Sequence, residues 1–207
     1  MKLIFKIISL LMLIHLINVS ALAIDINEIG DFSSRSIIIN SKRNNITQEQ
    51  KDILTSKKLT PTAQCLIEQI KKQNIENVRI LLMTGVSPNA NLFDVIPIYV
   101  AAKKNNFEIV KLLSEAGAKL DRGPYSELYI AIKNNNKEMA QYLLNKNANI
   151  YYIDAVTQNT ILYLALKNKM YDIAQQLINK NARADIKSIK YIKKHKLYYL
   201  IENKKRS

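Results

Sequence analysis

The sequence has few of the residues from which active sites and metal sites are built. Its 207 residues include one cysteine, two histidines and four glycines. A single cysteine excludes an intramolecular disulfide, and with His15 in the N-terminal segment too few side chains remain for a Cys/His metal cluster or a His-assisted nucleophile. The glycines form no phosphate-binding G-x-G-x-x-G or G-K-[ST] loop. We therefore expect no enzyme, no cofactor and no metal site.

Arginine is scarce in a chain that is otherwise basic. There are 31 Lys and Arg against 17 Asp and Glu, a net charge of +14, but only six of the 31 are arginine. Arginine is the side chain that reads phosphates and bases through its planar fork. Lys, Ile and Asn are abundant together, and their shared A/T-rich codons account for much of the excess charge. The composition therefore argues against nucleic acid as the partner.

The first 23 residues contain the three parts of a secretory signal peptide. A basic start is followed by an apolar run over residues 7–17 and by the A-x-A pattern Ala21-Leu22-Ala23. We expect cleavage between Ala23 and Ile24 and export to the periplasm or the outside of the cell. The alternative is an uncleaved anchor with the remainder facing outside, because the apolar stretch of residues 7–24 just reaches the length that spans a bilayer.

Four segments further along share one ending. Each closes with an apolar block and a marker residue, and the markers are spaced 32, 30 and 34 residues apart: Gly85, Gly117, Asn147 and Asn181. Helices commonly end on a left-handed residue, where Gly has no steric penalty and Asn is the best substitute. A second apolar block lies upstream of each marker, beyond a polar turn. The pattern predicts units of two short helices, which are stable only when neighbouring units bury each other's apolar faces.

This unit resembles the ankyrin repeat. The family opening Thr-Pro-Leu-His-x-Ala-Ala is matched best by Pro97-Ile98-Tyr99-Val100-Ala101-Ala102, and the family ending by residues 108–113 with Gly117-Ala118. The resemblance covers residues 62–187. It implies an all-α fold, an ankyrin-type helix-turn-helix stack of about four repeats at residues 62–92, 93–124, 125–156 and 157–187.

The sequence departs from the family pattern at two places. Tyr99, Tyr129 and Tyr163 stand where the family carries the His that helps to hydrogen-bond one repeat to the next, and Asn-rich turns replace the family's Gly-His. A tyrosine can substitute through its bulk and its hydroxyl group.

The segments on either side of the repeats are predicted to cap the stack. Residues 24–46 have no helical period and are expected to be an irregular lead. Residues 47–61 are expected to form an N-terminal helical cap, because Thr47 and Gln50 have the spacing of a capping box. Thr60-Pro61 then looks like the cap and first-turn proline of the next helix.

The other end is a basic C-terminal cap or tail at residues 188–207. Residues 187–207 hold eight Lys and Arg against one Glu, with apolar residues between them. This pattern fits the solvated face of a capping helix, and it also fits contact with an anionic membrane surface.

The resemblance also implies a function. Partners of ankyrin proteins usually dock on the hairpin tips and on the inner face of the first helices. By position, the hairpin tips are expected at residues 91–94, 121–125 and 151–154, and the candidate partner-binding residues are Phe93, Asp94, Arg122, Tyr125, Tyr151 and Tyr152. Aromatic residues and arginine are typical of contact hot spots. The alternative is that Phe93, Tyr125 and Tyr151 merely pack one hairpin on the next.

We therefore expect a non-enzymatic, exported protein–protein interaction module that is a monomer with an unidentified protein partner. With its export signal the chain resembles ankyrin proteins of intracellular bacteria. The alternative is an envelope-associated structural protein held at an anionic membrane surface by its basic tail or by an uncleaved N-terminal anchor.

Overall fold

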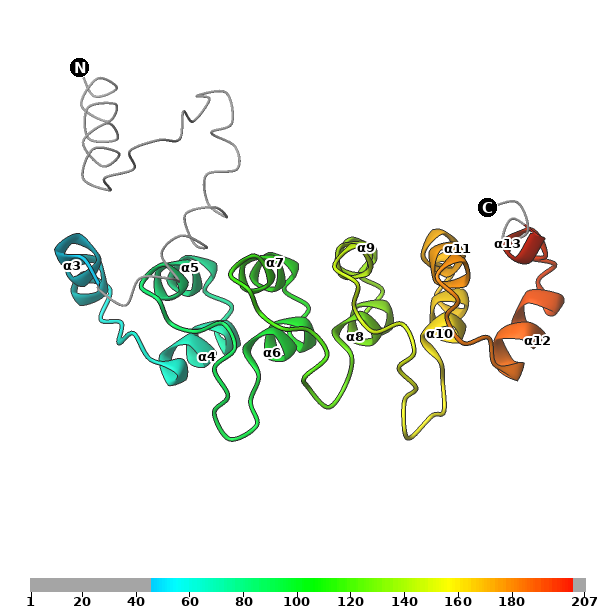
Figure 1. Ribbon diagram of the computed structural model, residues 1–207, viewed down its shortest axis with the longest axis horizontal. Coiled ribbons are helices and arrows are strands. Elements are labelled where there is room, and N and C mark those ends of the chain that lie inside the picture. Colours follow the sequence, from blue (N-terminus) through cyan, green and yellow to red (C-terminus); the bar gives the residue numbers. More distant parts are fainter. Residues whose placement is uncertain (1–45, 203–207) are drawn as a thin grey trace, which may run out of the picture. The chain divides into compact units, whose positions relative to one another are not determined.

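The computed structural model describes residues 46–202, which form two parallel rows of short helices (Figure 1). The helices, in chain order, are α3 (Gln48–Ser56), α4 (Ala63–Lys71), α5 (Ile75–Met83), α6 (Pro97–Lys103), α7 (Phe107–Glu115), α8 (Glu127–Lys133), α9 (Lys137–Asn145), α10 (Ile161–Lys167), α11 (Tyr171–Asn179), α12 (Ile186–Lys194) and α13 (Tyr199–Glu202). The predicted signal peptide, nearly all of the irregular lead and the last five residues of the basic tail lie outside the described residues.

The rows are built by stacking helix pairs. In the first row α4, α6, α8, α10 and α12 pack in succession, and in the second row α5, α7, α9, α11 and α13 do the same. The helices of the first four pairs, from α4 and α5 to α10 and α11, also contact each other, so the main contacts of a pair lie within it and with its neighbours. The prediction of an all-α helical repeat stack is confirmed. The last pair, α12 and α13, continues both rows beyond the four repeats.

A continuous apolar core lies between the rows. It runs from Leu54 in α3 to Leu200 in α13, and both Leu112 and Leu143 are buried in it. The lone thiol, Cys65, is also buried and free, as a small core residue is expected to be.

The marker residues end the second helix of each pair as predicted. Their φ angles are all positive, at 87° for Gly85, 92° for Gly117, 57° for Asn147 and 62° for Asn181. The next N–H then reaches back to the helix; that of Ala118, for example, donates to the Leu113 carbonyl at 2.9 Å.

Asparagines in the turns between paired helices cap a helix and also link neighbouring repeats. The Asn106 side chain caps α7 by accepting from the Ile109 N–H at 3.1 Å, and the Asn136 side chain caps α9 in the same way. The amide of Asn136 also donates to Asn105 in the preceding turn at 2.9 Å. One side chain thus satisfies a helix end and links two repeats, which explains how Asn-rich turns replace the family's Gly-His.

The N-terminal end of the stack agrees with the predicted capping box but shifts the next helix. The Thr47 side chain accepts from the Gln50 N–H, and the Gln50 side chain accepts from the Thr47 N–H. Helix α4, however, begins two residues later than Thr60-Pro61 suggested. Thr62 is its cap, because the Thr62 hydroxyl accepts from the Cys65 N–H at 3.2 Å, and Pro61 lies outside the helix.

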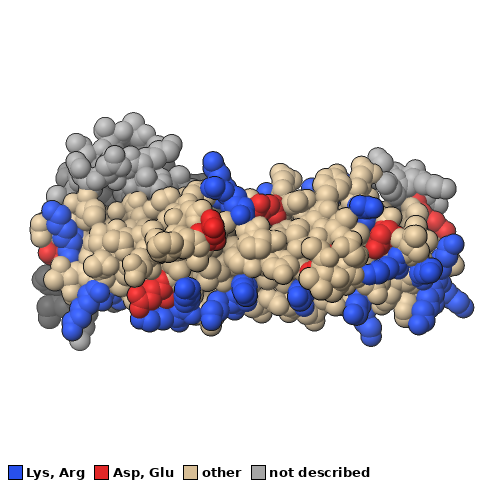
Figure 2. Space-filling model, turned by 90° about the horizontal axis from the view of Figure 1, so that it is seen from below, with Lys and Arg blue, Asp and Glu red and all other residues tan. Residues whose placement is uncertain are grey.

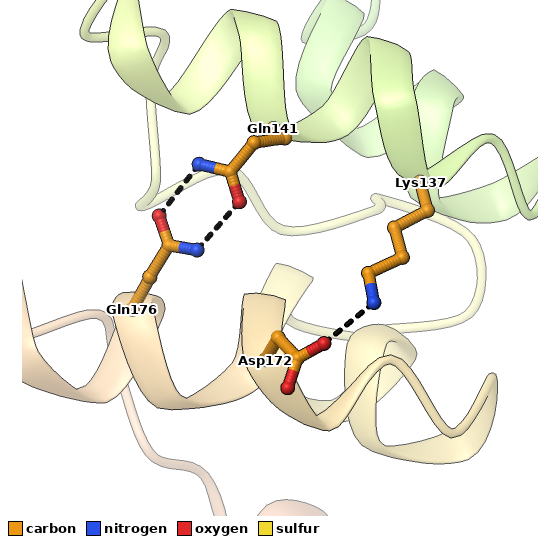
Figure 3. A network of polar contacts seen from close by, with 4 residues as sticks. All are labelled: Lys137, Gln141, Asp172 and Gln176. Atoms are coloured by element: carbon orange, nitrogen blue, oxygen red, sulfur yellow. Dashed lines mark hydrogen bonds and ion pairs between the residues drawn. The ribbon is translucent and has the colours of Figure 1, made fainter.

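Polar side chains on the second row join neighbouring repeats (Figure 3). Gln141 of α9 and Gln176 of α11 exchange two amide hydrogen bonds of 2.8 and 2.6 Å, and Lys137 pairs with Asp172. The Lys137 pair is well exposed and so contributes little to stability. Its position shows why an acidic residue recurs at the start of these helices: it favours the positive helix end and faces the previous repeat.

Candidate functional site

Three loops, which join α5 to α6, α7 to α8 and α9 to α10, extend to the same side of the rows (Figure 1). They carry every predicted partner-binding residue. Figure 2 looks onto this side: Lys and Arg gather along one long edge, and the middle of the face carries few charges. The face is therefore available for contacts that do not depend on charge.

The first loop ends in a tight two-residue turn at Phe93 and Asp94. Leu92 and Val95 form an isolated bridge on either side of it, and both tip residues have positive φ, 50° and 61°. The Phe93 side chain is 92% exposed. A bulky residue in the left-handed region is an outlier, and such strain is concentrated at functional sites. Packing on the next hairpin therefore does not explain why a phenylalanine stands at this position, because its side chain is exposed.

The second loop places Tyr125 in a cluster of rings. This tyrosine cluster consists of Tyr99, Tyr125, Tyr129 and Tyr152, with ring centroids 5.0 to 6.5 Å apart. Tyr125 is 37% exposed and Tyr152 is half-buried. Gly123 lies directly against Tyr99, since a Cβ at that position would stand 2.6 Å from the ring. Tyr125 and Tyr152 thus pack one hairpin on the next. The sequence left this alternative open for Tyr125 but not for Tyr152.

Tyr129 takes over the linking role of the family's His at this position. Its hydroxyl donates to the Asp154 carboxylate in the following loop at 2.9 Å. The second Asp154 oxygen accepts from the N–H groups of Val156 and Thr157 and from the Thr157 hydroxyl. Burial and the bond to Asp154 raise the pKa of Tyr129 to about 12. The hydrogen bonds from Thr157, followed by that from Tyr129, lower the pKa of Asp154.

The tip of the third loop lies further along the chain than the sequence predicts, and Asp154 is the reason. The loop between α9 and α10 was expected to turn at Tyr151–Asp154, but Asp154 is buried and starts a further turn. The tip therefore lies at residues 155–158, where Val156 is 86% exposed. Val156 was not predicted from the sequence. The available signal was Asp154, because an aspartate can start a turn by accepting from the N–H groups two and three residues ahead.

The buried carboxyl of Glu127 and the half-buried carboxyl of Asp121 form a pair at the base of the second loop. The Asp121 N–H donates to Glu127 Oε2, and the Asn149 N–H donates to Asp121 Oδ2, each at 2.7 Å. The remaining oxygens, Asp121 Oδ1 and Glu127 Oε1, are buried and have no hydrogen-bond partner among the described residues. Burial and the Asp121 charge raise the pKa of Glu127 to about 7, against the lowering effect of the N–H groups of Asp121 and of Glu127 itself.

The predicted site residues thus separate into two groups. Phe93, Asp94, Arg122 and Tyr151 are exposed, and Tyr151 is 60% exposed. Tyr125 and Tyr152 instead meet in the tyrosine cluster, at a centroid distance of 6.1 Å.

Among the described residues there is neither a candidate metal site nor a helix that could span a membrane. Residues 46–202 contain no group of three or more His, Cys, Asp and Glu side chains that could hold a metal ion. Within the same range no helix is long and apolar enough to cross a bilayer. The predicted anchor segment lies before this range.

The repeats are similar in sequence to those of known proteins. A family model described as ankyrin repeats (3 copies) matches residues 66–154 and again residues 98–189. The BRCA1-associated RING domain protein 1 of Caenorhabditis elegans is 32% identical over 89 residues, which are 41% of this chain and 13% of that protein. The similarity therefore concerns a small part of that much longer relative.

Proposed function

Because the chain belongs to the ankyrin repeat family, whose repeats generally mediate protein–protein interaction, we propose that it is an exported module that binds a protein through its loop tips. The family is generally non-enzymatic, which agrees with the scarcity of catalytic side chains in the sequence. The observation that carries the proposal is the exposure of Phe93, held in a strained backbone at a loop tip.

Three apolar side chains project from the loops. Phe93, Tyr151 and Val156 are 92%, 60% and 86% exposed, and they come from the first and third loops. Exposed apolar residues on neighbouring elements are a mark of interaction sites. Burial of the Phe93 and Val156 side chains by a partner would contribute about 1.5–3 kcal/mol each.

The binding test replaces Phe93 and Val156 by alanine together. Partners are first captured by affinity purification with crosslinking from cells that the exported protein meets. The double variant is expected to weaken the captured complex by about 2 kcal/mol or more, while its helix content stays unchanged. Ile53→Ala on α3, exposed but far along the chain from the loops, is the control. Unchanged binding by the double variant rejects the tips as the contact surface.

The tyrosines of the cluster are unsuitable for this test. Alanine at Tyr125 and Tyr152 would also remove contacts within the fold, because both rings contact Tyr129. Loss of binding in that variant could come from a displaced loop, so Phe93 and Val156 give the cleaner result.

Export is the second element of the proposal, supported by the A-x-A pattern after the apolar run. N-terminal sequencing of the protein from the exported fraction is expected to read from Ile24. An intact Met1 in the membrane fraction would instead establish the uncleaved anchor.

A further inference from the structure

The outward side of α12 combines exposed isoleucines with lysines. Ile186 and Ile189 are 71% and 41% exposed, and Lys190 and Lys193 are exposed beside them. These four residues follow the i, i+3, i+4, i+7 spacing, so they share one face of the helix. We call them the α12 face.

The opposite side of α12 explains why the α12 face points outward. Ser188 and Ile192 are buried there, and α12 packs on α10. Lys187 fixes the start of the helix by donating to the Thr157 carbonyl at 2.8 Å. Ile186 therefore lies next to the third loop on a firmly held helix.

The charge of this region has one sign. From Ile186 to Ile201 there is no Asp or Glu, and Lys187, Lys190, Lys193, Lys194 and Lys196 lie within that stretch. Among the described residues, Lys190 and Lys193 form no ion pair. The sequence adds Lys204, Lys205 and Arg206 beyond the described residues. An acidic surface is the complement of such a region.

We infer that the α12 face is a docking site for an anionic lipid bilayer, separate from the loop tips that bind protein. Lysines near a surface of acidic headgroups gain favourable electrostatic energy, while their stems allow the apolar residues between them to enter the headgroup region. Two isoleucines flanked by lysines fit this arrangement, because a bilayer accepts apolar side chains that an acidic protein surface without a pocket does not. Charge and apolar exposure together favour the bilayer over other occupants.

The test measures sedimentation with vesicles. The apolar N-terminal segment would bind lipid by itself, so the chain used begins at Ile24, and circular dichroism first establishes equal helix content in all variants. Vesicles of phosphatidylcholine alone are compared with vesicles of equal parts phosphatidylcholine and phosphatidylserine, at low and at physiological salt.

Binding to the phosphatidylserine vesicles alone is expected, and it should weaken as salt rises. The pair Lys190→Gln and Lys193→Gln should lower the partition coefficient roughly twentyfold, and Ile186→Ser with Ile189→Ser about tenfold. Lys103→Gln with Lys104→Gln removes the same charge at the end of α6 and should bind like the unchanged protein.

Three results overturn the inference. Absence of binding to phosphatidylserine vesicles rejects the site, and an equal loss in the α6 control shows that net charge alone is responsible. Concentration-dependent self-association that disappears in the isoleucine variant identifies a second copy as the occupant. Protein capture through Phe93 and Val156 is measured without lipid, so the two proposals fail independently.

Discussion

Glu127→Gln should stabilise the fold at alkaline pH and leave it nearly unchanged in acid. Glu127 is fully buried, and its carboxyl has a pKa of about 7 against an ordinary value of 4.5. Glutamine keeps the oxygen that accepts from the Asp121 N–H but cannot ionise. The substitution therefore removes only the cost of a buried charge.

The direction of this pH dependence follows from the two pKa values of the carboxyl, about 7 in the folded chain and 4.5 in the unfolded chain. Below pH 4.5 the carboxyl is protonated in both the folded and the unfolded chain, so ionisation costs the fold nothing. Between pH 4.5 and 7 only the unfolded chain loses the proton, and the free energy of unfolding falls. Above pH 7 both states are ionised and the full cost remains, about 3 kcal/mol for a difference of some two and a half pKa units.

The measurement is urea unfolding followed by helix circular dichroism at pH 4 and pH 8. Glu127→Gln is expected to raise the free energy of unfolding at pH 8 by up to about 3 kcal/mol, and to change it little at pH 4. Glu138→Gln, the same substitution at an exposed position in the first turn of α9, should change neither value by more than about 0.5 kcal/mol. An equal effect of Glu127→Gln at both pH values would refute the argument from a buried charge.

Two further predictions concern how the repeats hold together. Leu112→Ala or Leu143→Ala should cost about 2–5 kcal/mol and shift a single unfolding transition, because both side chains are buried between rows that unfold together; an unchanged denaturant midpoint would contradict the packing. Tyr129→Phe keeps the ring but loses the hydrogen bond to Asp154, and calorimetry should show a loss of about 1 kcal/mol, with a larger loss indicating that the loop rearranges.

The helices were predictable because their signals are local and recur. The Gly or Asn at each helix end and the spacing of the apolar blocks repeat four times, and each occurrence supports the others. The start of α4 was misplaced by two residues because Thr60 and Thr62 are both acceptable caps. Only the hydrogen bond from the Cys65 N–H to Thr62 decides between them.

The details of the loops were less predictable because they depend on contacts between repeats. From the sequence, Asp154 is predicted to be a tip residue. In the structure it is buried, and its carboxylate accepts from the hydroxyl of Tyr129, 25 residues earlier. Tyr125 and Tyr152 read as exposed aromatics, and only the stacking of neighbouring repeats brings their rings together. Long-range contacts of this kind have no signature in a single sequence.

Phe93→Gly should make the protein more stable and weaken its complex. At φ 50° the phenylalanine backbone carries a penalty that glycine lacks, about 1–2 kcal/mol, partly offset by the greater freedom of glycine in the unfolded chain. We expect a gain of about 0.5–1 kcal/mol in the free energy of unfolding. Phe93→Ala keeps the strained backbone and should leave stability unchanged, since the ring makes almost no contact within the fold. Both variants lack the ring, so both should lose the same binding energy. A stabilised Phe93→Gly protein with full affinity would show that the strained tip is not the contact residue.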